Sequence, residues 1–229
     1  MKYGIDVSMF INVDNLVKYK PDFVMIRSGE GGMRDAKTEY YAAQCRKNNI
    51  PYGYYHVLRL NNYTLAENVK SIKDAISKSG RPAMGVWVDV ETSDAYDNYY
   101  INLLCSQIEE MGLYAGVYAG VNQLRSGKIK APNYDKWVAF YGLDTGNLND
   151  FSDEDKSIIC NIGSLWQYHG SNSEPDLNVC FNDDLSIYAG TQSNDDVKNE
   201  IKAEIISIQT KLKALVEALN KIYKELEKL

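Results

Sequence analysis

The chain has 229 residues, of which 45% are hydrophobic and 24% charged, and its formal net charge is −6 at pH 7. This acidic balance argues against nucleic acid or an anionic membrane surface as the main partner, because both are bound by basic faces. The sequence contains no run of about 18 apolar residues, so we expect no membrane insertion. The length allows one large domain with an appendage, or two small domains.

The residues that usually hold metals are few and scattered. The four cysteines form no CxxC pair, and there are only two histidines. We therefore expect neither a metal site nor a cofactor, and chemistry based on carboxylates. Residues 1–6 lead directly into an apparent strand, without the pattern of a signal peptide, so we expect synthesis in the cytoplasm.

Strand-like and helix-like segments alternate along the first half of the chain. The spacing predicts strands at residues 3–7, 23–27, 52–58, 84–90 and 115–119. Between them it predicts helices at residues 13–19, 36–48, 64–78 and 98–111. Thr64 and Glu67 have the spacing of a capping box at the start of one helix.

The alternation of predicted strands and helices ends after Gly120. Residues 137–141, 164–168 and 176–180 resemble strands, with no long helices predicted between them. This order predicts an α/β fold, a TIM-like barrel of the (β/α)5β3 type. Barrels of this kind carry their chemistry at the C-terminal ends of the strands.

Carboxylates follow several of these strands. Asp89 and Glu91 end the fourth strand with a spacing of two, which puts both side chains on one face. Adjacent acids raise at least one pKa, and glycoside hydrolysis needs a protonated acid beside a carboxylate. Asp6 ends the first strand and Asp176 lies in the last, so all four side chains can meet at one mouth. The alternative is a set of solvated surface acids.

The last part of the chain has a different pattern. Residues 191–196 are polar and predict a linker between a barrel at 1–190 and a coiled-coil helix at 197–229. Apolar residues recur there with four-three spacing: Ile201, Ile205, Ile208, Leu212, Leu215, Leu219, Ile222, Leu226 and Leu229. Leucine at most a positions with isoleucine at most d positions favours a homo-oligomer, a tetramer in particular. The alternative is one amphipathic helix that packs on its own barrel.

Four short motifs in this order resemble family-25 glycoside hydrolases. They are YGIDVS at residues 3–8, WVDVE at 87–91, LWQY at 165–168 and DLN at 176–178. That family consists of muramidases (lysozymes) and includes many phage endolysins. The resemblance covers residues 1–190 and implies a barrel of five β/α units followed by three strands.

The resemblance also implies an activity and a site. The enzyme would cleave the β-1,4 bond between N-acetylmuramic acid and N-acetylglucosamine in bacterial peptidoglycan, with retention of configuration. By motif position Glu91 is the proton donor, and Asp6, Asp89 and Asp176 are the other acidic members. The negative charge of Asp89, two positions away on the same face, is expected to raise the pKa of Glu91. Three aromatic residues would line the sugar groove: Tyr55, Tyr118 and Trp166.

Other features of the site leave alternatives open. Two routes remain open for the step that follows proton donation by Glu91. Either Asp6 or Asp176 acts as the nucleophile at the anomeric carbon, or the 2-acetamido group of the substrate attacks that carbon instead. Arg27 either orients a site carboxylate or forms an ion pair, whereas His56 and Arg59 are interpreted as structural or rim residues. The loop at residues 170–175, GSNSEP, departs from the glycine-rich approach of the family.

Two other functions compete with the enzyme. One is a catalytically silent carbohydrate-binding barrel, although the presence of all four acids argues against it. The other is a scaffold whose purpose is its coiled coil. We expect a phage-encoded, bacteriolytic endolysin, made without a signal peptide, that acts on the cell wall after release.

Overall fold

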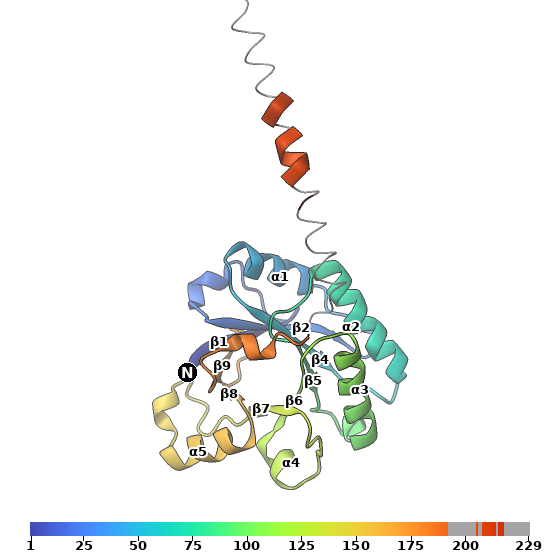
Figure 1. Cartoon of the computed structure of the whole chain (residues 1–229). Coiled ribbons are helices and arrows are strands. Elements are labelled where there is room, and N and C mark those ends of the chain that lie inside the picture. The colour runs from blue at the N-terminus through green and yellow to red at the C-terminus, as the bar shows by residue number, and fades with distance from the viewer. Residues whose placement is uncertain (192–204, 206–207, 214, 218–229) are drawn as a thin grey trace, which may run out of the picture. The chain divides into compact units, whose positions relative to one another are not determined.

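The structure, a computed structural model, describes residues 1–191, 205, 208–213 and 215–217. The chain divides into two compact units, Met1–Thr191 and Gln192–Leu229. Figure 1 shows the first unit as a ring of strands with helices outside it. The ring consists of β1 (Lys2–Val7), β2 (Phe23–Glu30), β4 (Tyr52–Val57), β5 (Val86–Asp89), β6 (Ala115–Gly120), β7 (Asp135–Ala139), β8 (Leu165–His169) and β9 (Asp176–Cys180).

The strand pairing closes the barrel. Neighbouring strands from β1 to β8 are parallel, and the short β3 (Met33–Arg34) adds a hairpin to the end of β2. The last strand, β9, is antiparallel to both β8 and β1 and fills the gap between them. The predicted eight-stranded α/β barrel is thereby confirmed.

The helices lie outside the ring, most of them close to their predicted positions. They are α1 (Thr38–Lys47), α2 (Leu65–Ser79), α3 (Asn98–Glu110), α4 (Val121–Arg125) and α5 (Asp153–Ile162), with the short 3-10 segments η1 (Leu16–Tyr19), η2 (Ser93–Ala95), η3 (Leu148–Asp150) and η4 (Leu185–Tyr188). The predicted capping box is confirmed, because the Glu67 carboxylate accepts from Thr64 N at 2.7 Å and Glu67 N donates to Thr64 Oγ1 at 3.3 Å. None of the described helices combines the length and the apolar character that crossing a membrane requires.

Two helical predictions were wrong. The segment predicted as a helix at 13–19 forms only η1, which Asn15 caps. Helix α5 was missed, although Ser152 and Asp155 form a capping box at its start. The shorter Asp replaces the usual Glu or Gln there, which weakens the sequence signal.

Side chains alternate between the inside and the outside of the barrel. Large side chains fill the part of its interior that lies towards the N-terminal ends of the parallel strands: Phe23, Met25, Met84, Trp87, Tyr118, Trp137, Leu165, Cys180 and Tyr188. Gly4 is needed in this layer, because a Cβ at that position would lie 2.3 Å from the Phe23 ring. Towards the C-terminal ends of the strands the inward-pointing side chains are mostly polar, and together with Tyr118 and Trp137 of this layer they form the site.

The second unit is described only in part. Residues 205, 208–213 and 215–217 are helical. Their large apolar side chains are exposed: Ile205, Ile208, Leu212, Leu215 and Val216. The remaining positions of the predicted coiled coil, and residues 192–196 of the predicted linker, lie outside the described residues.

Candidate active site

A polar cavity of about 280 Å³ opens at the C-terminal ends of the barrel strands. Its lining comes from every strand of the ring or from the loop that follows it. The lining residues are Asp6, Ser8, Phe10, Arg27, Tyr55, Val57, Asp89, Glu91, Tyr118, Trp137, Tyr141, Gln167 and Asp176. All four carboxylates singled out from the sequence therefore lie in one cavity.

The strand directions explain how distant carboxylates meet. Asp6 lies near the end of β1 and is paired with Asp176, the first residue of the antiparallel β9. Asp89 is the last residue of β5 and is only 3% exposed. Glu91 follows two residues later and is exposed at the rim. Asp89 is thus almost fully buried, whereas Glu91 is partly desolvated by the site but still reaches solvent.

The amide of Gln167 connects Asp6 and Asp176. Its Nε2 donates to Asp6 Oδ2 at 2.8 Å and to Asp176 Oδ2 at 3.0 Å. Its Oε1 accepts from the hydroxyls of Tyr118 at 2.6 Å and Tyr141 at 2.7 Å. Because the two phenols donate to one end of the amide, its donor end is left to face the two carboxylates.

Each of these two carboxylates has a further donor. Asn178 Nδ2 donates to Asp6 Oδ2 at 2.8 Å, and Trp137 Nε1 holds that amide by donating to its Oδ1 at 2.9 Å. The backbone N of Ser171 donates to an oxygen of Asp176 at 2.6 Å. Ser171 belongs to the GSNSEP loop, so the loop that departs from the family pattern still supports Asp176.

Burial controls the protonation of the cluster. It raises the pKa of Asp6 to about 8, with a further contribution from Asp176, while Asn178 and Gln167 act in the opposite direction. It raises the pKa of Asp176 to about 6, against the hydrogen bond from Ser171. At neutral pH, Asp176 is therefore mostly ionised and Asp6 mostly protonated.

The expected electrostatic relation between Asp89 and Glu91 needs correction. The sequence suggested that the charge of Asp89 raises the pKa of Glu91. In the structure burial is the main cause of the raised pKa of Glu91, and Tyr118 and Arg59 oppose it. Asp89 is the more perturbed acid, because burial and then the charge of Glu91 raise its pKa well above the usual value. Its buried Oδ1 has no hydrogen-bond partner among the described residues, as suits a protonated carboxyl.

The aromatic residues expected in the sugar groove divide into two groups. Tyr55 and Tyr118 line the cavity. Trp166 does not, and this prediction was wrong: the side chain is 1% exposed, packs against Phe151 and donates from Nε1 to the Phe140 carbonyl at 2.8 Å. It points outward because β8 places its neighbours in the sequence, among them Gln167, inside the barrel.

The sequence analysis missed other lining residues, chiefly Phe10, Trp137, Tyr141 and Gln167. The LWQY motif contained a signal for Gln167, because an amide two positions from Leu165 shares the face of an interior residue. Phe10 and Tyr141 lie in loops that follow strands, where residue spacing gives no direction.

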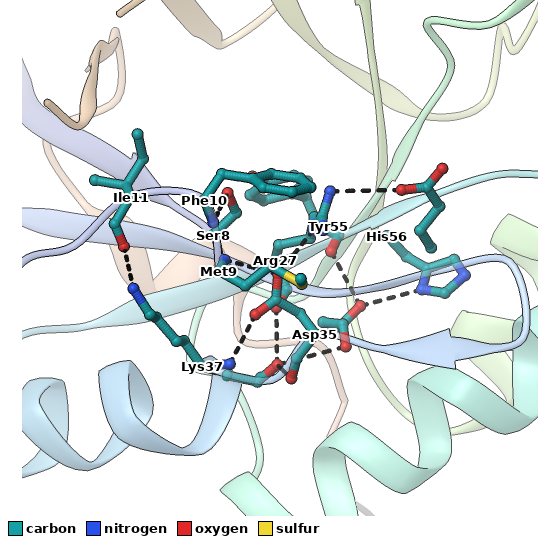
Figure 2. Close-up of polar contacts among 12 residues, drawn as sticks. Ser8, Met9, Phe10, Ile11, Arg27, Asp35, Lys37, Tyr55 and His56 are labelled. Atoms are coloured by element: carbon teal, nitrogen blue, oxygen red, sulfur yellow. Dashed lines mark hydrogen bonds and ion pairs between the residues drawn. The ribbon is translucent and has the colours of Figure 1, made fainter. Parts of the chain in front are cut away.

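The basic and imidazole side chains near the site have structural partners. Arg27 Nε donates to Asp35 Oδ2 at 2.8 Å (Figure 2), which favours the ion-pair interpretation. Arg27 also lines the cavity. Arg59 pairs with Glu30 at 2.7 Å. His56 is buried, with Ser28 Oγ 3.2 Å from its Nδ1, and burial lowers its pKa to about 4. Both His56 and Arg59 therefore have the structural role that was expected.

Asp35→Ala is expected to lower the free energy of unfolding by about 3 kcal/mol, because it removes the nearer and more deeply buried of the two ion-pair partners of the buried Arg27 and leaves only Glu30, at 3.5 Å. Asp74→Ala is the matched control, since Asp74 pairs with Lys70 at 2.6 Å on the exposed surface of α2. That change should lower the free energy by less than about 1 kcal/mol. Urea unfolding of both variants measures the difference, and equal losses would contradict the prediction.

Asp6→Asn is expected to stabilise the folded chain at pH 8. The pKa of Asp6 is raised from 3.8 to about 8, so between these values the folded state holds a proton that the unfolded state has lost. Stability therefore falls as pH rises through this window, and a neutral amide removes the effect. The gain at pH 8 should exceed about 1 kcal/mol, the equivalent of less than one pKa unit. Unfolding at pH 4 is the control, where the gain should vanish; a loss of the same size at both pH values would refute the prediction.

The match to known proteins agrees with this geometry. The family model for glycosyl hydrolases family 25 matches residues 5–177, which include all four carboxylates. No sequence among curated proteins matches the chain.

Solved structures share the fold. The catalytic domain of an endolysin from a bacteriophage of Listeria monocytogenes has a TM-score of 0.65 and 23% identity, over 83% of this chain and 98% of that chain. A muramidase from Acremonium alcalophilum has a TM-score of 0.62 and 16% identity, over 82% and 99%. A family 25 glycosyl hydrolase from Bacillus anthracis has a TM-score of 0.60 and 17% identity, over 84% and 94%. With its own motifs and site in agreement, the chain belongs to glycosyl hydrolase family 25 and is an N-acetylmuramidase, a hydrolase of bacterial peptidoglycan.

Proposed function

We propose that this enzyme cleaves the β-1,4 bond between N-acetylmuramic acid and N-acetylglucosamine, and that Glu91 is the proton donor. One observation carries the assignment: an exposed acid with a raised pKa lines the same cavity as three further carboxyl groups. A general acid must stay protonated near its working pH and must reach the leaving oxygen. Burial raises the pKa of Glu91, which is the direction that a general acid needs, and its side chain reaches solvent at the rim, where a leaving oxygen can approach it.

The other three acids are assigned different roles according to whether each is ionised or protonated. Asp176 is mostly ionised at neutral pH, so we assign it to stabilise the positive charge that develops at the anomeric carbon. Asp6 is mostly protonated and shares the Gln167 amide with Asp176. Burial and the charge of Glu91 raise the pKa of Asp89 well above its usual value, so we assign Asp89 to remain neutral beside Glu91.

The reaction is proposed to retain the anomeric configuration by one of two routes. In the first, an Asp176 oxygen bonds to the anomeric carbon while the glycosidic bond breaks and the Glu91 proton moves to the leaving oxygen. In the second, the oxygen of the 2-acetamido group forms that bond and Asp176 orients the amide. In both, water then attacks the anomeric carbon as Glu91 takes its proton, and the bond formed in the first step breaks, which frees Asp176 or restores the 2-acetamido group. Inhibition by a thiazoline analogue favours the second route, and a covalent adduct on Asp176 favours the first.

Product analysis tests the proposed bond. Purified Gram-positive peptidoglycan is digested, and the products are reduced with borohydride and identified by mass spectrometry. New reducing ends on muramic acid support the assignment, whereas ends on glucosamine would place the cut at the other bond. A folded sample that gives no products would favour the catalytically silent carbohydrate-binding barrel.

We also propose that residues 1–190 are the catalytic barrel, 191–196 a linker and 197–229 a coiled coil that assembles a homo-oligomer, with a tetramer favoured. The four-three spacing supports this, as do the exposed apolar side chains of the described helical residues, such as Leu212 and Leu215. Several barrels on one stalk would raise residence on a polymeric wall through avidity. Light scattering on the full chain and on a Leu212→Glu, Leu215→Glu variant tests it, because a monomeric unmodified chain would favour a single docked helix or no assembly.

An endolysin role in phage lysis is the proposed biological setting. The similarity to the catalytic domain of a phage endolysin supports it. Expression in the cytoplasm of a susceptible bacterium should leave the cells intact until the membrane is permeabilised. Lysis without permeabilisation would contradict this setting.

A further inference from the structure

Phe10 is a large apolar side chain that is 71% exposed and lines the catalytic cavity. It lies in the loop after β1, two residues beyond Ser8, which also lines the cavity. Single exposed apolar residues are common on protein surfaces and need no function. Phe10 differs from such residues in its place at the cavity and in the way that both its ring and its backbone are held.

A fixed cation supports one face of the Phe10 ring. The guanidinium carbon of Arg27 lies 4.6 Å from the ring centroid. Asp35 fixes the guanidinium at 2.8 Å, and Glu30 lies 3.5 Å from its Nη1. Figure 2 shows Arg27 with the Phe10 ring on one side and Asp35 on the other. A cation at this distance holds the ring in place by a cation–π interaction, while most of the ring surface stays exposed.

The backbone on either side of Phe10 is anchored as well. Met9 N donates to Asp35 Oδ2 at 2.9 Å, and Lys37 Nζ donates to the Ile11 carbonyl at 2.8 Å (Figure 2). Ile11 N closes a turn by donating to the Ser8 carbonyl at 3.1 Å. An aromatic ring that is already ordered loses little conformational freedom when a ligand packs on it, which favours binding.

We propose that Phe10 is a stacking platform for a pyranose ring of the glycan strand, at the rim of the cavity. The inference rests on the proposed function and adds a binding residue to it. A pyranose has one face of C–H groups, which packs on an aromatic face, and hydroxyls at its edge that need polar partners. Phe10 offers the apolar surface, while Ser8 and the carboxylates that line the same cavity offer polar partners.

Phe10→Ala should raise KM about three- to tenfold on glycan strands from which the stem peptides have been removed, because the lost packing is comparable to one aromatic contact. The kcat should change less than about twofold, since the platform lies outside the proton-transfer groups. Phe10→Trp should keep KM near that of the unmodified enzyme. Tyr99→Ala is the matched control, because Tyr99 is 69% exposed on α3 and does not line the cavity.

Three outcomes would overturn the proposal: an unchanged KM in Phe10→Ala, an equal rise in Tyr99→Ala, or a rise that appears only on strands that still carry stem peptides. The last would assign Phe10 to the peptide instead of the sugar. Failure of the proposed function is a separate result, because it would appear as an unmodified enzyme that releases no reducing muramic acid.

Discussion

Glu91→Gln is expected to lower kcat on peptidoglycan by about 10²- to 10⁴-fold while the barrel keeps its fold. Glutamine keeps the size of the side chain but has no acidic proton to give to the leaving oxygen. Glu91 is exposed at the rim, so the change leaves the buried layers of the barrel untouched. Steady-state release of reducing ends measures the loss, and thermal unfolding verifies the fold.

Two controls separate acid catalysis from a general disturbance of the site. Glu154→Gln changes another exposed acid, one on α5 that does not line the cavity, and should leave kcat unaltered. On a dinitrophenyl glycoside that the unmodified enzyme hydrolyses, Glu91→Gln should lose little rate in bond cleavage, because this leaving group needs no proton. A near-normal rate on peptidoglycan, or an equal loss on both substrates, would remove Glu91 from the role of proton donor.

The sequence could predict that the carboxylates lie in one site, because they stand at the ends of predicted strands. Asp6 and Asp89 close apolar segments that read as parallel strands, and such strands end at one mouth of a barrel. Asp176 stands at the start of its strand instead, which fits the same mouth only because β9 is antiparallel. The succession of bare strands after Gly120 was compatible with this reversal but did not require it.

The face of β8 was not predictable from its residues. Leu165, Trp166 and Tyr168 are all apolar or aromatic, so the alternation that normally separates the inside of a strand from its outside is missing. Trp166 looked like a sugar-binding residue on its chemistry alone. Barrel closure decides the question by turning Gln167 inward, and α5, which the sequence analysis missed, contributes to the outer side that covers Trp166.

The sequence also could not predict which of the acids hold their protons, for a different reason. A spacing of two indicates that Asp89 and Glu91 share a face, but not that one is buried and the other exposed. Burial depth sets which acid holds its proton, and depth follows from closure of the ring and from the loops above it. Sequence reasoning therefore found the members of the acidic group and assigned the main perturbation to the wrong one.

Gln167→Leu is expected to lower kcat by about 10²-fold with little change in KM. Leucine has a similar size but cannot donate, so Asp6 and Asp176 lose the amide that holds them together, and a misplaced group in an active site has an effect of this order. The loss of a donor also raises the pKa of a carboxylate, because hydrogen bonds to the charged form favour it. The acidic limb of the pH–rate profile should therefore move to higher pH.

The shift of that limb is what separates a positioning residue from a packing residue. The other groups facing Asp6 are Asp176 and Asn178 from β9 and Glu91 beyond β5, and all remain in the variant. Trp166→Phe is the matched control, because it alters the neighbouring residue on the outer face of β8 and should leave the profile in place even if stability falls. A profile of kcat/KM that moves in neither variant would mean that Gln167 only fills space, and the two aspartates would then owe their positions to Asn178 and the Ser171 backbone.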